Sequence, residues 1–113
     1  MWKYCGVVRD EKNLLIGLKE IKNLKNKVKD IDVRIGEDDC SDLISLLEFE
    51  ASLLTAESTI ISALYRKESR GSHQRNDYPQ LSEDEENVNY SISLKNDELE
   101  ITKIKNHKLS SEL

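Results

Sequence analysis

The spacing of apolar residues predicts two long helices in the first seventy residues of the chain. In the first helix, apolar side chains recur at steps of three and four, which places them on one face. These residues are Leu14, Leu18, Ile21, Leu24, Val28 and Ile31. Asp10 precedes them as a candidate N-cap, and lysines occupy the opposite face. We expect the stripe to face a core, although a basic amphipathic helix can also bind a membrane or a partner protein.

The segment from 41 to 70 predicts a second helix that is apolar around most of its circumference, as expected for the central helix of a bundle. Its three adjacent stripes are Leu43, Leu47, Leu54 and Ile61; Leu46, Leu53 and Ile60; and Phe49, Ala56 and Ala63. Glu50 and Glu57 interrupt the stripes on a shared face. Paired carboxylates can serve acid–base chemistry or a metal. No histidine or further carboxylate joins them at helical spacing, so we expect them to pair with lysines or arginines of a neighbouring helix.

The rest of the chain predicts an extended segment followed by a β-hairpin. Residues 81–87 are rich in Glu and Asp and indicate a solvated acidic linker. Apolar and polar residues then alternate twice, with Tyr90, Ile92 and Leu94 before an Asn-Asp pair and Leu99 and Ile101 after it. Two alternating runs across a two-residue turn predict a hairpin over 88–105. Residues 106–113 are expected to form a flexible tail.

These patterns together predict a mainly α fold. It would consist of a small antiparallel helical bundle of about three helices in residues 1–80, then the extended segment and the short C-terminal β-hairpin. The length of 113 residues suits one compact domain. Trp2 and Tyr4, near the start of the chain, would cover one end of the bundle.

The stretch from Tyr65 to Pro79 combines four basic side chains with acidic residues, a histidine, two tyrosines and the only proline of the chain. We expect the second helix to end near Arg70, with Gly71 in the left-handed conformation that often follows a helix. Pro79 then favours extended chain. Arginine presents a planar fork of donors to carboxylates and carbonyl oxygens. Such a segment could dock one domain on another or bind an anion.

The same stretch resembles a signature of a known family. The matching residues are Arg66, Glu68, Ser69, Arg70, Gly71, His73, Arg75, Asp77, Tyr78 and Pro79. They are similar to the motif in the C-terminal helical domain of a flavoprotein family, which comprises L-aspartate oxidase and the flavoprotein subunits of succinate dehydrogenase and fumarate reductase. The opening residues Met1, Trp2, Tyr4, Gly6, Val8 and Arg9 look like the start of that domain in L-aspartate oxidase. The hairpin tail is the feature closer to the succinate dehydrogenase and fumarate reductase branch.

The resemblance implies that this chain is one domain of an FAD-dependent oxidoreductase, with L-aspartate oxidase preferred over the other branch. Such an enzyme converts L-aspartate to iminoaspartate for NAD biosynthesis. The ten motif residues would dock this domain on the FAD-binding and capping domains, and substitution of Arg70 or Arg75 by alanine would then barely affect the isolated domain. A rival from another class is a stand-alone helical interaction module.

Composition narrows the chemistry that the chain can perform. Its net charge of −5 disfavours nucleic acid as a partner. Cys5 and Cys40 are isolated thiols, and no apolar run is long enough to span a membrane, so we expect a cytoplasmic protein. The four glycines stand alone and form no Gly-x-Gly-x-x-Gly unit. We therefore expect no catalytic, FAD-binding or metal-binding residue in this chain; self-association into a homo-oligomer stays open.

Overall fold

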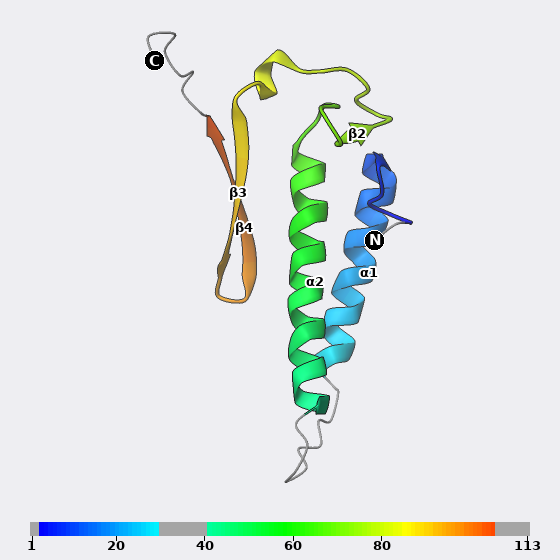
Figure 1. Ribbon diagram of the computed structural model, residues 1–113, viewed down its shortest axis with the longest axis vertical. Helices are drawn as coiled ribbons and strands as arrows, with labels where there is room; N and C mark the ends of the chain where they lie inside the picture. The colour runs from blue at the N-terminus through cyan, green and yellow to red at the C-terminus, as the bar shows by residue number, and fades with distance from the viewer. Residues whose placement is uncertain (1–2, 30–40, 106–113) are drawn as a thin grey trace.

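Two antiparallel helices and a β-hairpin make up most of the protein. The computed structural model describes residues 3–29 and 41–105. Its elements in chain order are β1 (Val8–Arg9), α1 (Glu11–Lys29), α2 (Ser41–Tyr65), β2 (Gln74–Arg75), a 3-10 helix η1 (Glu83–Glu85), β3 (Val88–Lys95) and β4 (Glu98–Lys105). In Figure 1, α2 runs antiparallel beside α1, and the β3–β4 hairpin lies along another flank of α2. No helix in the described ranges is both long and apolar enough to cross a membrane.

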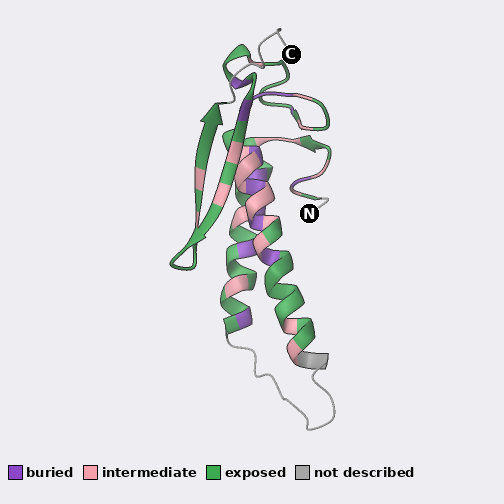
Figure 2. Ribbon diagram, turned by 60° about the vertical axis from the view of Figure 1, so that its left-hand side comes forward, coloured by how far each residue is buried: buried purple, intermediate pink, exposed green. Residues whose placement is uncertain are grey.

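The core is formed where the two helices face each other. Leu14, Ile21 and Val28 recur every seven residues along α1 and are buried, so they form one straight row. They pack against a matching row on α2 that includes Leu53 and Ile60. Figure 2 shows the buried positions gathered on the facing sides of the helices and in the chain above them. Burial of each such side chain contributes roughly 1.5–3 kcal/mol, so this seam is the main source of helix stability.

The N-terminus of α1 is capped as the sequence predicts. The Asp10 carboxylate accepts a hydrogen bond from the backbone N–H of Asn13 at 2.8 Å, and its carbonyl accepts one from the N–H of Leu14 at 3.0 Å. Midway along α1, Gly17 allows a close approach of other groups. A Cβ atom at Gly17 would lie 2.8 Å from Tyr4 Cβ and 3.3 Å from Ile60 Cδ1. The missing side chain therefore lets the N-terminal segment lie directly on the helix.

Both helices also carry large apolar side chains that face outward. On α2 these include Ile44, Leu47 and Phe49, and on α1 they include Leu15 and Ile16. The near-continuous apolar pattern of α2 is thus only partly covered by α1 and the hairpin. A helix that is apolar on more faces than its neighbours cover is typical of a piece of a larger packed structure.

The mainly α, three-helix bundle expected from sequence is wrong. Within the described ranges there are two α-helices, together with two two-stranded sheets, so the fold is mixed α and β. Residues 3–7 form turns and bends, and Val8 and Arg9 then pair in parallel with Gln74 and Arg75. This pairing forms because the chain returns past the N-terminal segment after α2, where the N–H of Asn76 donates to the carbonyl of Arg9 at 2.7 Å.

The predicted hairpin is present. Strands β3 and β4 pair antiparallel over eight residues each, with Ile92 opposite Ile101 and Lys95 opposite Glu98. Asn96 and Asp97 both have positive φ, 51° and 63°, which is the conformation of a type I′ turn. These two residue types tolerate that conformation well, so the Asn-Asp pair sets the register of the hairpin.

Candidate functional site

The residues singled out by sequence lie in one irregular segment, 66–82, which follows α2 and which we call the arginine bend. It begins earlier than expected, because α2 ends at Tyr65 and not near Arg70. Gly71 does have positive φ, 57°, but it lies in a turn closed by paired backbone hydrogen bonds between Arg70 and His73. The expected left-handed glycine is therefore confirmed, while its role as a helix cap is wrong.

Glu68 is the acidic centre of the arginine bend and is fully buried, with 0% of its surface exposed. Its carboxylate accepts hydrogen bonds from Arg66 Nη1 at 2.7 Å, from Arg70 Nε at 2.8 Å and Nη2 at 3.2 Å, and from the N–H of Ser82 at 2.9 Å. Burial alone would raise the pKa of Glu68, but the bonds from Arg70, Ser82 and Arg66 outweigh it and lower the pKa to about 2. Glu68 is thus a fixed anion around which the bend folds.

Arg75 is the basic centre and is 1% exposed. Its Nη1 donates to the carbonyls of Ala63 at 3.1 Å and Leu64 at 2.9 Å, which lie in the last turn of α2. Carbonyls in the last turn of a helix lack partners within the helix and carry partial negative charge, so a guanidinium there both satisfies and stabilises them. Arg75 therefore caps α2 from a distance of about a dozen residues along the chain.

Asp77 extends this contact to the other helix. Arg75 Nε donates to Asp77 Oδ1 at 3.0 Å, and Arg75 Nη2 donates to Asp77 Oδ2. The same carboxylate accepts a hydrogen bond from the N–H of Glu11 at 3.2 Å, at the first residue of α1. Its pKa is lowered, because the hydrogen bond and charge of Arg75 outweigh the opposing effect of burial. One ion pair thus joins the negative end of α2 to the positive end of α1.

Ser69 holds the bend together from within. Its hydroxyl donates to the carbonyl of Tyr78 at 2.7 Å and accepts from the N–H of Arg75 at 2.9 Å. The Tyr78 ring in turn lies under the Arg75 guanidinium, 4.7 Å from its centre, which is a cation–π contact. Pro79 follows on the exposed outside of the bend.

His73 is half-buried between the bend and β1. Its Nε2 lies 3.0 Å from the carbonyl of Arg66, and its Nδ1 lies 3.0 Å from Arg9 Nη1. These partners require a neutral ring that donates through Nε2 and accepts through Nδ1. Burial lowers the pKa of His73, and the nearby positive charges of Arg9, Arg75 and Arg66 lower it further.

The sequence that forms this arrangement matches the model of a protein family. A family model described as the fumarate reductase flavoprotein C-terminal domain matches residues 1–112. The chain belongs to this family. The expectation from the motif is thereby confirmed at the level of the family, and the arginine bend is part of a flavoprotein C-terminal domain.

The relatives of this flavoprotein domain are several times longer. The chain is 40% identical over 80 residues to a subunit of the fumarate reductase (CoM/CoB) of Methanothermobacter marburgensis, covering 71% of this chain and 15% of that protein. It is 35% identical over 85 residues to the L-aspartate oxidase of Acinetobacter baylyi, covering 74% of this chain and 14% of that protein. The chain therefore spans about 15% of the length of such relatives.

Solved structures of the family share the fold of the domain. A variant of FrdA from the E. coli quinol fumarate reductase superposes with a TM-score of 0.77 at 26% identity, over 96% of this chain and 20% of that one. Mycobacterium smegmatis Sdh1 gives a TM-score of 0.75 at 23% identity, over 92% of this chain and 18% of that one. The two helices, the bend and the hairpin thus form an established arrangement.

Sequence reasoning did not predict the polar contacts of five residues that complete the domain's polar network. Arg9 reaches His73, and Ser82 donates its N–H to Glu68. Glu85 is buried in η1 and accepts hydrogen bonds from Tyr90 Oη at 2.6 Å and Lys103 Nζ at 3.2 Å. Burial and this carboxylate raise the pKa of Tyr90 to about 12. Glu85 lies in the predicted solvated linker, and its burial shows that this part of the linker instead packs under the hairpin.

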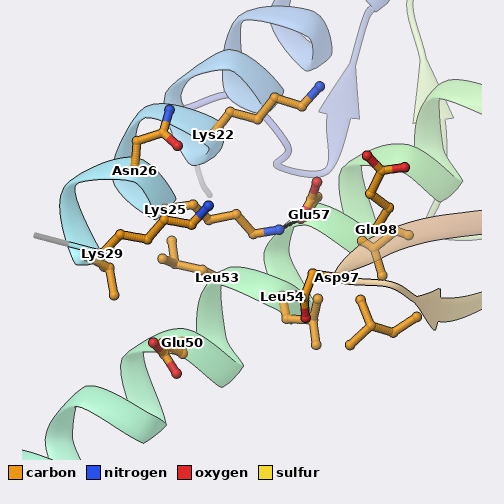
Figure 3. A pocket seen from close by; sticks show the side chains of 13 residues that line it. Lys22, Lys25, Asn26, Lys29, Glu50, Leu53, Leu54, Glu57, Asp97 and Glu98 are labelled. Atoms are coloured by element: carbon orange, nitrogen blue, oxygen red, sulfur yellow. Dashed lines mark hydrogen bonds and ion pairs between the residues drawn. The ribbon is translucent and has the colours of Figure 1, made fainter.

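A separate cleft of about 840 Å³ lies between α1, α2 and the tip of the hairpin. Figure 3 shows Lys25 of α1 reaching across to Glu57 of α2, with which it forms an ion pair. The expected pairing of Glu57 with a neighbouring helix is confirmed. Glu50 is exposed and has no ion-pair partner within 3–29 and 41–105. In the same ranges, no group of three or more His, Cys, Asp or Glu side chains is placed to hold a metal.

Of the two cysteines, only Cys5 lies within the described part of the chain. Cys5 is a buried free thiol, and its pKa is raised by burial. Cys40 lies outside the described residues, as do Met1, Trp2 and the predicted tail at 106–113.

The described residues do not form a dinucleotide-binding unit. Their only parallel strands are the two-residue β1 and β2, and no glycine-rich turn leads from either strand into a helix.

Proposed function

We propose that this chain is the C-terminal domain of an FAD-dependent L-aspartate oxidase, which oxidises L-aspartate to iminoaspartate for NAD biosynthesis. In this proposal the domain braces the flavin-binding and capping domains and is not catalytic by itself. The 35% identity to the A. baylyi enzyme and the 33% identity to the L-aspartate oxidase of Pyrococcus horikoshii support the assignment. The residues around the motif and at the start of the chain also resemble that enzyme.

One structural observation carries the bracing role. Glu68 and Arg75 of the arginine bend are buried and bonded within the domain, whereas large apolar side chains of α2 such as Leu47 and Phe49 face outward. An inward-bonded charge network gives rigidity rather than chemistry, and exposed apolar side chains favour contact with another packed surface. These features are expected of a domain that packs against the other domains of a larger protein and supports them.

We further propose that the outer rim of the arginine bend forms part of the contact with the flavin domain. The side chain of Arg70 is 40% exposed even though it bonds Glu68. Tyr78 is also exposed, and its ring is oriented by Arg75. Both side chains are therefore held in place and yet accessible, as an interdomain contact requires.

A second candidate is the flavoprotein subunit of a fumarate reductase or succinate dehydrogenase. The 40% identity to the M. marburgensis fumarate reductase favours it. So does the superposition on FrdA, which extends over 96% of the chain and so includes much of the hairpin.

The coding sequence upstream of Met1 tests the proposal. We expect a continuous reading frame that encodes a strand, a Gly-x-Gly-x-x-Gly turn and a helix. The purified longer protein should then carry flavin and oxidise L-aspartate. Turnover of succinate or fumarate without L-aspartate oxidation would favour the second candidate. A stop codon and a true translation start directly before Met1 would instead support a stand-alone interaction module.

A further inference from the structure

A second pocket lies where β1, the end of α2, the arginine bend and β3 meet. Its volume is about 390 Å³, within the range of small-ligand sites. Its polar lining consists of Arg9, Thr59, Ser62, Arg66, His73 and Tyr90. Two guanidinium groups, an imidazole, a phenol and two hydroxyls are thus gathered around one space. None of the lining residues is a carboxylate.

Three carboxylates in the arginine bend and η1 are already paired with other groups. Glu68 is bonded to Arg66 and Arg70, and Asp77 is bonded to Arg75. Glu85 is bonded to Lys103 and to Tyr90. Glu68 is shared by two arginines, so these ion pairs leave the surroundings of the pocket with an excess of positive charge that comes from Arg9 and from the Arg66–Glu68–Arg70 cluster.

Arg9 is half-buried and has no carboxylate partner in the described part of the chain. Its Nε donates to the carbonyl of Gly6 at 2.8 Å, and its Nη1 contacts His73 Nδ1 at 3.0 Å. Its Nη2 has no partner among the described residues. A partly buried cation normally has a counter-charge, because removal from water is costly. The guanidinium is therefore fixed in direction by neutral groups, with its charge still uncompensated.

Ser62 differs from the other hydroxyl residues along this side of α2. The hydroxyls of Ser58 and Thr59 donate to carbonyls four residues earlier, at 2.8 and 2.9 Å. Within 3–29 and 41–105, the Ser62 hydroxyl has no hydrogen-bond partner, and it lines the pocket. It is thus free to donate into that space.

We propose that this pocket binds a small oxyanion, either a carboxylate or a phosphate. Arg9 supplies the charged donors, Ser62 supplies a neutral donor, and the neutral His73 ring holds Arg9 in position. Planar guanidinium donors match the oxygen atoms of both anion types. The site is distinct from the bracing role proposed above and does not depend on it.

Binding can be measured by NMR titration of the 113-residue chain with inorganic phosphate and, separately, with acetate, each at constant ionic strength. The amide and arginine N–H resonances around Arg9 and Ser62 should shift and saturate, with a Kd of about 1 to 10 mM for an open site of this size. Stronger saturation by phosphate or by acetate identifies which of the two oxyanions the pocket prefers. Sodium chloride at the same ionic strength is the control and should produce no saturating shift.

Variants distinguish a specific binding site from general electrostatic attraction of anions to the protein. Arg9→Gln should weaken binding roughly 10-fold or more, and Ser62→Ala should weaken it about 2- to 10-fold. Ser58→Ala removes a hydroxyl from the same helix outside the pocket and should leave the Kd unchanged. If Arg9→Gln does not fold, Arg9→Lys tests the fork geometry while retaining the charge.

Three results would overturn the proposal. The first is the absence of saturation with either oxyanion up to about 50 mM, several times the expected Kd. The second is an equal effect of Ser62→Ala and Ser58→Ala on the Kd. The third is a chloride titration that reproduces the same shifts.

Discussion

Arg75 and Glu68 are charged side chains in positions that small domains usually fill with apolar ones. Both are almost completely buried, and both have their hydrogen-bonding groups matched to partners. Buried charges of this kind are tolerated only when they are fully paired, and loss of one partner is then costly. Their contribution is to hold the arginine bend in one conformation.

We expect Arg75→Ala to destabilise the isolated domain by about 3–5 kcal/mol, because it leaves the α2 carbonyls and Asp77 without their partner. This differs from the sequence-based expectation that the isolated domain would barely notice the change. Urea unfolding followed by circular dichroism measures the effect. Lys67→Ala is the matched control, since Lys67 is an exposed cation within the bend. Similar stability of Arg75→Ala and Lys67→Ala would contradict the capping role.

The charge on Glu68 predicts a specific dependence of stability on pH. The pKa of Glu68 is about 2 in the folded protein, against 4.5 for an ordinary glutamate. As pH falls below 4.5, the unfolded chain takes up this proton first, so the stabilisation is complete above that pH and is lost towards pH 2. The difference in unfolding free energy between the parent protein and Glu68→Gln should therefore shrink over this range. A difference that stays constant from about pH 6 to about pH 2 would be inconsistent with an ionised Glu68.

At the scale of the elements, the seam between α1 and α2 depends on close approach as well as on apolar spacing. Gly17 lies in the middle of α1, where glycine normally lowers helix stability by about 1 kcal/mol. Here the absent Cβ leaves room for Tyr4 and Ile60. The glycine is thus explained by packing between elements, and not by the helix itself.

Gly17→Val should destabilise the domain by about 1–3 kcal/mol through overpacking against Tyr4. Lys19→Val, at an exposed position two residues away, introduces the same β-branched side chain without that contact. The melting temperatures of the two variants, measured by thermal unfolding, separate the effect of overpacking from the effect of helix propensity. Because valine favours a helix more than glycine does, helix propensity alone would leave Gly17→Val no less stable than the parent protein, and that result would contradict the packing role.

At the scale of the whole molecule, no element within 3–29 and 41–105 covers the part of α2 around Leu47. Leu47 is 55% exposed, whereas Leu53 on the same helix is 6% exposed. The main apolar packing of the described domain is therefore the contact between α1 and α2. The outward side chains of α2 are available for contact with other domains of the larger protein proposed above.

Leu47→Lys should change the unfolding free energy of the isolated chain by less than about 0.5 kcal/mol, as exposed substitutions usually do. Leu53→Ala, the core control, should cost about 2–5 kcal/mol. In the longer flavoprotein proposed above, Leu47→Lys should weaken flavin retention, measured as flavin released on mild heating. Full retention would mean that this face of α2 does not contact the flavin domain.

Local patterns in the sequence determined several features of this protein. Apolar residues at helical spacing identified both helices and the buried row of α1, and the Asn-Asp pair between alternating runs identified the hairpin. The motif from Arg66 to Pro79 identified the family. These features depend on neighbours that lie within a few residues along the chain, which is why they are readable without a structure.

Three features were decided by the tertiary structure alone. They are the residue at which α2 ends, the pairing of β1 with β2, and the burial of Glu68 and Arg75 in the arginine bend. Each depends on contacts between distant residues, such as Arg75 with the Ala63 carbonyl and Asn76 with the Arg9 carbonyl. The apolar pattern stops at Tyr65, but polar residues can continue a helix, and nothing in the local sequence signals that Arg75 will fold back to cap it. A guanidinium that can satisfy several carbonyls at once ends the helix at Tyr65, and only the folded chain brings it there.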